Sequence, residues 1–261
     1  MTFATKPLSQ FDHAPLLEVK DVTVTFGGLN AVDGAELMLG DNELLGFIGP
    51  NGAGKTTLMR AIIGMLTPAK GRIILEGQDI SKRRIVDRIN LGMALAQQII
   101  KPLKDMTLLD NVALAAGGGK LLSPIKAKWH RSRQKEQDVA SALLSEVGLA
   151  EVIHKYPSEL PLGYLKRLEV ARALARQPKV LLLDEPLAGL SKKESEEMAD
   201  LIMGLPRQGR SVILIEHNLA QVRRICKILY VQNNGRPLAF GNTDEVLAKR
   251  EVQMAYLGKT D

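Results

Sequence analysis

The stretch GPNGAGKT at residues 49–56 constrains the fold more than any other part of the sequence, because it fits the pattern G-x-x-x-x-G-K-[ST]. It follows a short apolar run, ELLGFIG, and it opens KTTLMRAIIGML, whose apolar residues recur at helical spacing. A glycine-rich loop between a strand and a helix lets backbone N–H groups converge on phosphate oxygens, and the helix N-terminus adds the positive end of its dipole. The sequence therefore predicts a nucleotide-phosphate loop.

The residues of this loop have separate predicted roles. Lys55 is expected to meet the outer phosphates, and the Thr56 hydroxyl is expected to ligate Mg²⁺. ATP with Mg²⁺ is the cofactor that this chemistry implies. The predicted nucleotide-binding residues form one continuous run, which comprises Gly49, Pro50, Asn51, Gly52, Ala53, Gly54, Lys55, Thr56 and Thr57.

The rest of the chain alternates segments of strand and helix character. Such alternation predicts an α/β fold with a mainly parallel sheet. FGGLNAVDG at 26–34 has the composition of a turn, Asn234-Gly235 predicts a hairpin, and NTDEVLAKR at 242–250 begins like a capped helix. The predicted strands are LLEVKDVTVTF, ELLGFIG, RIILEG, KVLLLDE and SVILIEH, and KKESEEMADLIMGL is predicted as an amphipathic helix.

Strand signals disappear between about residues 100 and 170, where TLLDNVALAA and QDVASALLSEVGL carry apolar residues at helical spacing. This predicts a helical subdomain of about 100–170, inserted into one domain of 16–261 whose core is 16–99 and 171–261, behind a tail of 1–15. The basic loop 117–135 is interpreted as a solvated loop, with contact to a membrane surface or a partner as the alternative.

Composition excludes several classes of function. The single cysteine rules out an internal disulfide framework, and the four scattered histidines show no metal-ligand spacing. No secretory signal is expected at the N-terminus, and no apolar stretch approaches the roughly 18 residues that a transmembrane helix needs. The net charge of +6 is modest and favours polyanions such as nucleotide phosphates.

A second motif, VLLLDE at 180–185, completes the predicted chemistry. Its strand would project Asp184 toward the metal and Glu185 toward the γ-phosphate, where a carboxylate can polarise attacking water. The apolar strand before His217 similarly brings an imidazole to the end of the sheet. A lone histidine there is usually structural, but the order of motifs favours contact with the γ-phosphate or the water.

That order resembles the nucleotide-binding subunit of an ABC transporter over residues 17–258. The resemblance rests on the phosphate loop, AQQII, LPLGYLKRLEVARAL, VLLLDEP, AGLS and IEH. It implies a RecA-like P-loop NTPase core with an antiparallel β portion and an inserted helical subdomain. It also implies that Phe26 stacks on adenine and that Gln98 touches Mg²⁺ and senses the transmembrane partner. Gln97 is the alternative, and the count back from MTLLDN favours Gln98.

Finer features, among them FGGLNAV, MTLLDN, IEHN and AYLG, are similar to the larger ATPase subunit of branched-chain amino acid importers, the LivG type. The resemblance implies permease subunits and a second ATPase subunit as partners, indirectly a solute-binding protein, and a cytoplasmic location on the inner face of the cell membrane. Import of urea or amides and export of lipopolysaccharide are alternative cargoes. A soluble ATPase acting on nucleic acid or ribosomes is a further alternative, but no nucleic-acid partner is expected.

One loop departs from the family. The family's signature loop reads close to Leu-Ser-Gly-Gly-Gln and serves the nucleotide held by the other subunit of a dimer, whereas this chain has Leu160, Pro161, Leu162, Gly163 and Tyr164. Proline tolerates the first turn of a helix, so the helix dipole is expected to persist. The lost serine hydroxyl and backbone donor are each expected to weaken the site, at roughly 3 kcal/mol or about a hundredfold in rate per donor.

The weak signature predicts two different ATPase subunits, one strong site and one weak site, because this chain's phosphate loop needs a signature from elsewhere. Ser191, where the family usually has aspartate, is a second departure in a loop that crosses the dimer interface. A homodimer that tolerates both changes is the alternative.

Overall fold

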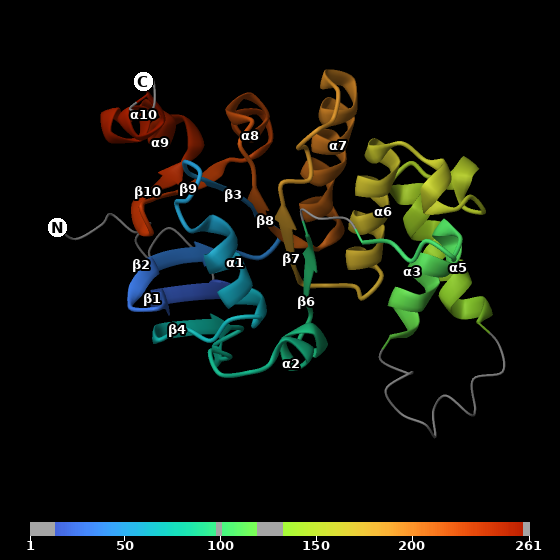
Figure 1. Ribbon diagram of the computed structural model, residues 1–261, viewed down its shortest axis with the longest axis horizontal. Helices are drawn as coiled ribbons and strands as arrows, with labels where there is room; N and C mark the ends of the chain where they lie inside the picture. The colour runs from blue at the N-terminus through green and yellow to red at the C-terminus, as the bar shows by residue number, and fades with distance from the viewer. Residues whose placement is uncertain (1–13, 98–100, 119–132, 258–261) are drawn as a thin grey trace.

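Two β-sheets organise the chain in the computed structural model, which describes residues 14–97, 101–118 and 133–257 (Figure 1). The larger sheet has six strands in the order β10-β9-β3-β8-β7-β6, and all neighbours are parallel except β10 and β9. The expectation of a mainly parallel sheet is confirmed. Its strands are β3 (Leu44–Ile48), β6 (Met93–Ala96), β7 (Val180–Asp184), β8 (Ser211–Ile215), β9 (Ile228–Asn233) and β10 (Arg236–Asn242).

The smaller sheet is antiparallel, in the order β2-β1-β4-β5. Its strands are β1 (Leu17–Phe26), β2 (Leu29–Leu39), β4 (Lys70–Leu75) and β5 (Gln78–Asp79). The predicted turn over 26–34 was wrong beyond its first residues. Only Gly27 and Gly28 form the turn, both at positive φ, and β2 begins at Leu29 because it pairs with β1 through several register shifts.

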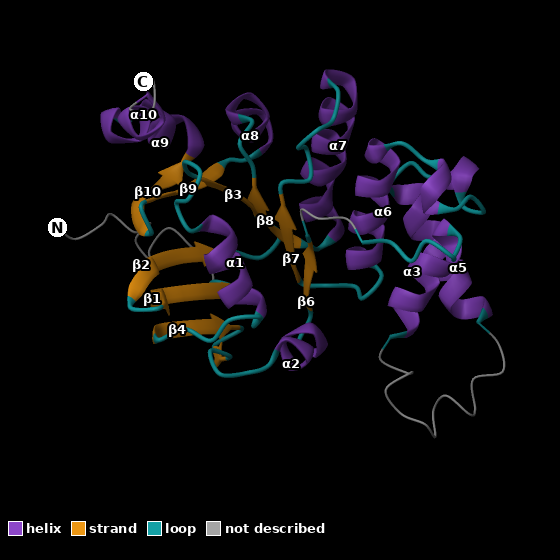
Figure 2. Cartoon of the chain, viewed as in Figure 1, coloured by secondary structure: helices purple, strands orange, loops and turns teal. Residues whose placement is uncertain are grey.

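The side chains of the parallel strands alternate between two cores, as the period of two in a strand requires. In β7, Leu181 and Leu183 face one core, while Val180 and Leu182 face the other. The first core packs against the helices α6, α7 and α8, and the second contains the α1 helix and the inner face of the antiparallel sheet. Figure 2 shows α1 between the two sheets. The flanking helices are α1 (Lys55–Ile63), α2 (Ile85–Asn90), α7 (Lys192–Gly204), α8 (Leu219–Ile225), α9 (Thr243–Ala248) and α10 (Arg250–Leu257).

Three helices gather at one end of the molecule, beyond β6 and β7 (Figure 1). They are α3 (Leu108–Gly117), α5 (Gln134–Glu146) and α6 (Leu162–Leu174), with short 3₁₀ turns at Ala150–Val152 and Pro157–Glu159; a further 3₁₀ turn at Leu205–Gln208 follows α7. The helices predicted near 107 and 137 are present, and Thr107 caps α3 by accepting a hydrogen bond from the Asp110 N–H. α6 continues past the predicted limit at residue 170.

A buried arginine fixes the far end of the helix that carries the phosphate loop. Arg88, on α2, is fully buried. Its guanidinium donates to the carbonyl oxygens of Ala61 and Ile62 in the last turn of α1, at 2.7 and 2.8 Å. It also donates to the carbonyls of Ser81 and Arg83. The Ala61 carbonyl also accepts from the Gly64 N–H at 3.2 Å, so the guanidinium adds a second bond there, and its positive charge complements the helix dipole.

Candidate active site

The phosphate loop links β3 to α1, as predicted from the sequence. At Gly54, φ is 91° and a Cβ atom would lie 2.3 Å from the Ala31 carbonyl oxygen. At Gly49 a Cβ atom would lie 2.0 Å from the Gln232 carbonyl oxygen. Both positions therefore exclude a side chain, because the loop is pressed against neighbouring backbone.

The β9–β10 hairpin supports this loop from behind. The fully buried Gln232 donates from its side-chain amide to the Ala53 carbonyl at 2.7 Å, and the Gly235 N–H donates to the same carbonyl at 3.1 Å. Gln232 was not among the residues predicted from the sequence. Its one signal was a polar residue at the end of the apolar run ILYV, before the predicted hairpin turn.

Lys55 folds back over the loop that precedes it. The side chain is buried, and Nζ donates to the carbonyl oxygens of Gly49 at 2.7 Å and Pro50 at 3.0 Å. These two bonds hold the ammonium group at the phosphate loop. Phosphate oxygens would meet the backbone N–H groups and the N-terminus of α1 in the same place.

Asp184 and Thr56 meet at the carboxyl edge of the parallel sheet. The Thr56 hydroxyl hydrogen-bonds to the Asp184 carboxylate, whose Oδ1 atom is buried and has no hydrogen-bond partner. Burial raises the pKa of Asp184 and the neighbouring Glu185 raises it further, while Arg60 and Lys55 oppose the shift. A buried carboxylate oxygen without a partner, next to a hydroxyl, fits a hard cation such as Mg²⁺.

Glu185 and His217 follow adjacent parallel strands, so their side chains reach the same edge of the sheet. The distance from His217 Nε2 to Glu185 Oε1 is 2.5 Å. The Glu185 backbone has φ of 53°, in the left-handed region, and its N–H donates to the Ile215 carbonyl at 3.0 Å. A non-glycine residue in this conformation is held there by its surroundings and is frequent at functional sites.

Two further predicted residues lie around this edge. Phe26 ends β1 and is 50% exposed, so its ring is accessible to a planar group. Gln98 lies outside the described residues. The adjacent Gln97 follows β6 and lines a hollow of about 390 Å³ together with Thr56, Arg60 and Asp184.

The signature segment begins α6, as expected for a proline just before a helix. Pro161 is the residue before the first helical position, with φ of −68°, and it provides no side-chain cap. Leu162 and Tyr164 are exposed at the helix start, whereas Leu160 is partly buried against the first core. The signature loop therefore presents one aliphatic and one aromatic side chain where the family pattern has glycine and glutamine.

The glycine retained in this segment has a contact within the chain. A Cβ atom at Gly163 would lie 2.6 Å from Glu194 Oε1, in the first turn of α7. Ser191 is the N-cap of α7: its hydroxyl accepts from the Glu194 N–H at 3.3 Å, and its own N–H donates to Glu194 Oε2 at 3.0 Å. Serine and aspartate are comparable N-caps, so the Ser191 departure preserves the helix start.

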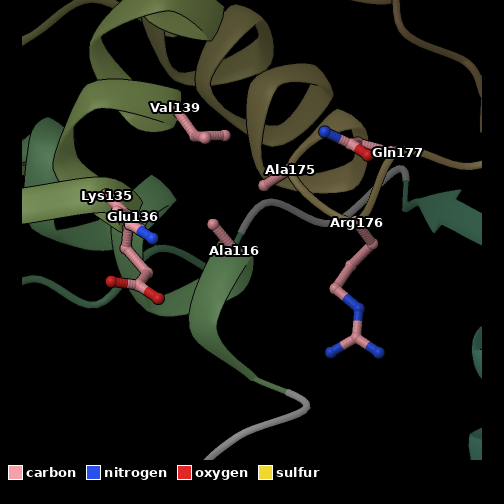
Figure 3. Close-up of a pocket in the computed structure, with 7 residues that line it drawn as sticks. All are labelled: Ala116, Lys135, Glu136, Val139, Ala175, Arg176 and Gln177. Carbon is pink, nitrogen blue, oxygen red and sulfur yellow. The ribbon is translucent and has the colours of Figure 1, made fainter. Parts of the chain in front are cut away.

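A separate pocket of about 270 Å³ lies in the helical region, between the end of α3, the start of α5 and the residues after α6 (Figure 3). Figure 3 shows Arg176 and Glu136 on different sides of it, with Ala116 and Ala175 between them. None of its lining residues belongs to the predicted site. Among the residues that the structure describes, no cluster of three or more metal-binding side chains occurs, and no helix is long and apolar enough to cross a membrane.

A phosphate loop on a parallel sheet, with two acidic residues and a histidine at the carboxyl edge, is the arrangement of a nucleotide hydrolase. Residues 32–188 match the ABC transporter family. The high-affinity branched-chain amino acid transport ATP-binding protein LivG of Escherichia coli strain K12 is 35% identical over 254 residues, covering 94% of this chain and 98% of the relative. BraF of Pseudomonas aeruginosa, of the same description, is 34% identical over 94% of this chain and 98% of its own length.

The lipopolysaccharide export system ATP-binding protein LptB of Haemophilus influenzae is 28% identical, with 94% of this chain and 98% of the relative covered. Among solved structures, an ATP-binding cassette of an ABC transporter in its ADP conformation superposes with a TM-score of 0.82 at 28% identity, covering 95% of this chain and 100% of that one. The chain belongs to the ATP-binding subunits of ABC transporters, a family of nucleotide-binding ATPases coupled to transport.

Proposed function

We propose that this chain hydrolyses MgATP to power an importer of branched-chain amino acids or related small polar solutes. The named relatives LivG and BraF support this cargo class, and the lower identity to LptB makes export of lipopolysaccharide the weaker alternative. The observation that carries the catalytic proposal is the contact between Glu185 and His217 at the edge where Asp184 and Thr56 also meet.

The proposed chemistry divides among these residues. The phosphate loop and Lys55 bind the β- and γ-phosphates, and Phe26 stacks on the adenine. Thr56, Asp184 and Gln98 would hold Mg²⁺, which neutralises developing charge on the phosphates when it is bound. Glu185 accepts a proton from the attacking water, and His217 orients the Glu185 carboxylate and meets the γ-phosphate.

We further propose that the partner across the nucleotide site is a distinct ATPase subunit. Pro161 has no N–H and no hydroxyl, so the start of α6 offers the opposite nucleotide fewer donors than the family pattern does. This chain's phosphate loop would then be served by a standard signature in the partner, with permease subunits contacting the pair at the inner face of the membrane. The opposite, weaker site would be the one that this chain's signature serves.

Substitution of Glu185 by Gln tests the catalytic proposal. The variant is expected to bind MgATP normally and to lose about a hundredfold or more in turnover, because the amide cannot accept the proton. Lys55→Ala should instead abolish nucleotide binding or turnover. Undiminished hydrolysis in Glu185→Gln would remove Glu185 from its role, and unchanged kinetics in Lys55→Ala would overturn the phosphate-loop assignment.

Purification of the tagged chain from detergent-solubilised membranes, followed by mass spectrometry of the intact complex, tests the partners. Two permease subunits with a second, distinct ATPase would support the asymmetric importer. Two copies of this chain with permeases would keep the transporter but refute the asymmetry. Ribosomal or nucleic-acid partners without permeases would overturn the proposal.

A further inference from the structure

A pair of buried charged residues lies behind Glu185 and has no part in the chemistry proposed above. Lys166 sits in the second turn of α6, and Glu216 follows β8. Their exposed fractions are 7% and 3%. Lysine and glutamate are rarely buried to this extent unless partners hold them, so the contacts of each side chain indicate what the pair does.

Lys166 holds the backbone of Glu185. Its Nζ atom donates to the Glu185 carbonyl oxygen at 2.7 Å. On the other side of the same residue, the Glu185 N–H donates to the Ile215 carbonyl. The left-handed φ of Glu185 is an unfavourable conformation for a glutamate, and it persists only where surrounding contacts fix it. Lys166 supplies one of these two contacts.

Glu216 holds the backbone on both sides of the contact between Glu185 and His217. Its carboxylate accepts from the Leu187 N–H at 2.7 Å and from the His217 N–H at 3.2 Å. Leu187 follows Glu185 by two residues, so the same carboxylate positions the loop that carries Glu185 and the residue whose imidazole meets it. The direction of the Glu185 side chain therefore depends on both members of the pair.

The charges of the pair depend on each other. Burial lowers the pKa of Lys166, while the carboxylates of Glu216, Glu185 and Asp184 oppose that shift. Burial raises the pKa of Glu216 to about 7, the bonds from the Leu187 and His217 N–H groups oppose this shift most, and Lys166 opposes it further. Burial raises the pKa of the Cys226 thiol, which follows α8, and the Glu216 charge raises it further. Without Lys166, Glu216 would keep its two N–H bonds but lose a nearby positive charge that also favours its carboxylate form.

We propose that Lys166 and Glu216 are positioning residues that aim the Glu185 carboxylate at the attacking water. This inference rests on the proposed function of Glu185. α6 then has a second role. It begins at the signature loop, and through Lys166 it is also bonded to the loop that carries Glu185 in the same chain. If Lys166 and Glu216 only stabilised the fold, their removal would lower the free energy of unfolding. If they position Glu185, their removal lowers kcat.

Lys166→Met tests the proposal in the complex purified with the tagged chain, since methionine keeps most of the apolar stem and removes the donor. We expect kcat to fall about 10- to 100-fold, the range that small misplacements of a reacting group produce. KM for MgATP and the affinity for a fluorescent ATP analogue should stay within about twofold, because binding uses the phosphate loop. Lys82→Met, at an exposed lysine on the turn before α2, is the matched control and should leave kcat unchanged.

Two further variants keep the test decisive. Glu216→Gln should also lower kcat at constant KM, since an amide cannot accept from both N–H groups through two oxygens, and it serves alone if Lys166→Met fails to fold. In a Glu185→Gln background, Lys166→Met should cause no further loss, because both changes remove the same carboxylate function.

Three results would overturn the inference: turnover within about twofold of the parent in Lys166→Met or Glu216→Gln, a matching loss of nucleotide affinity, or full additivity with Glu185→Gln. If Glu185→Gln itself leaves hydrolysis intact, the proposed function fails instead. If Glu185→Gln stops hydrolysis while Lys166→Met does not slow it, only the positioning role fails.

Discussion

Arg88→Met should destabilise the fold without touching the candidate active site. Arg88 donates four hydrogen bonds to backbone carbonyls, two of them in the last turn of the helix that begins at Lys55. Burial lowers the pKa of its guanidinium to about 10, which still leaves it charged at neutral pH. Methionine replaces the stem but provides no donor for any of these oxygens.

The expected change in the free energy of unfolding is the difference between two opposing contributions. Each buried carbonyl left without a donor costs about 1–3 kcal/mol, while removal of the guanidinium relieves a desolvation cost of several kcal/mol. Because the Ala61 carbonyl keeps its bond from the Gly64 N–H and other carbonyls can relax toward new donors, we expect a net loss of about 3 kcal/mol in the free energy of unfolding. For a chain of this length each kcal/mol shifts Tm by about 2–4 °C, so Tm should fall by about 6–12 °C.

Differential scanning calorimetry of the purified chain, with and without MgATP, measures this shift. Arg84→Met is the matched control, because the Arg84 side chain is 83% exposed and its ion pair with Asp87 lies on the surface, where such a pair is worth less than about 1 kcal/mol. The rise in Tm on adding MgATP should persist in both variants, since the phosphate loop lies at the other end of the helix. Equal Tm values for Arg88→Met and Arg84→Met would show that the four hydrogen bonds from Arg88 do not stabilise the fold.

Three other predictions concern the loops and the buried carboxylate. Gly54→Ala should weaken ATP binding about tenfold or more, measured by nucleotide titration, because its Cβ would collide with the Ala31 carbonyl at 2.3 Å. Ser191→Ala should cost about 1 kcal/mol in urea unfolding and Ser191→Asp almost nothing, as expected for an N-cap; equal losses would contradict that role. The raised pKa of Glu216, about 7 against an ordinary 4.5, contributes stability below pH 4.5 that is lost as the pH rises through 7. Glu216→Gln should therefore gain Tm relative to the parent between those pH values, and a constant difference would exclude this titration.

Local sequence signals sufficed wherever a few neighbouring residues set the backbone. Asn234 and Gly235 both adopt positive φ at the predicted hairpin, and Asn242 caps the predicted helix by accepting from two N–H groups. Local sequence signals did not predict β2. Gly34 and polar residues interrupt its apolar pattern, and only pairing with β1 defines the strand. Strand formation there depends on a partner rather than on local composition.

The residues of the candidate site likewise fall into those that local sequence predicts and those that only tertiary packing brings together. Its motif residues were predictable, because a glycine-rich loop before a helix and acidic residues after an apolar strand have chemistry that short stretches encode. Lys166 and Glu216 gave no comparable signal. They are 19 and 31 residues from Glu185 in the chain. The packing of α6 against the edge of the sheet brings the Lys166 ammonium to the Glu185 carbonyl, and the pairing of β8 with β7 brings the Glu216 carboxylate to the Leu187 N–H.

Gly163 belongs to the signature segment, and its contact inside the chain could not be predicted from that motif. A Cβ atom at this position would lie 2.6 Å from the Glu194 Oε1 atom, the end of a flexible side chain that would have to shift. The class of fold and the chemistry of the phosphate loop could both be predicted before folding was considered, since both follow from local spacing. Packing decided which backbone groups Gln232, Lys166 and Glu216 hold, because burial and hydrogen-bond partners arise only when distant segments meet.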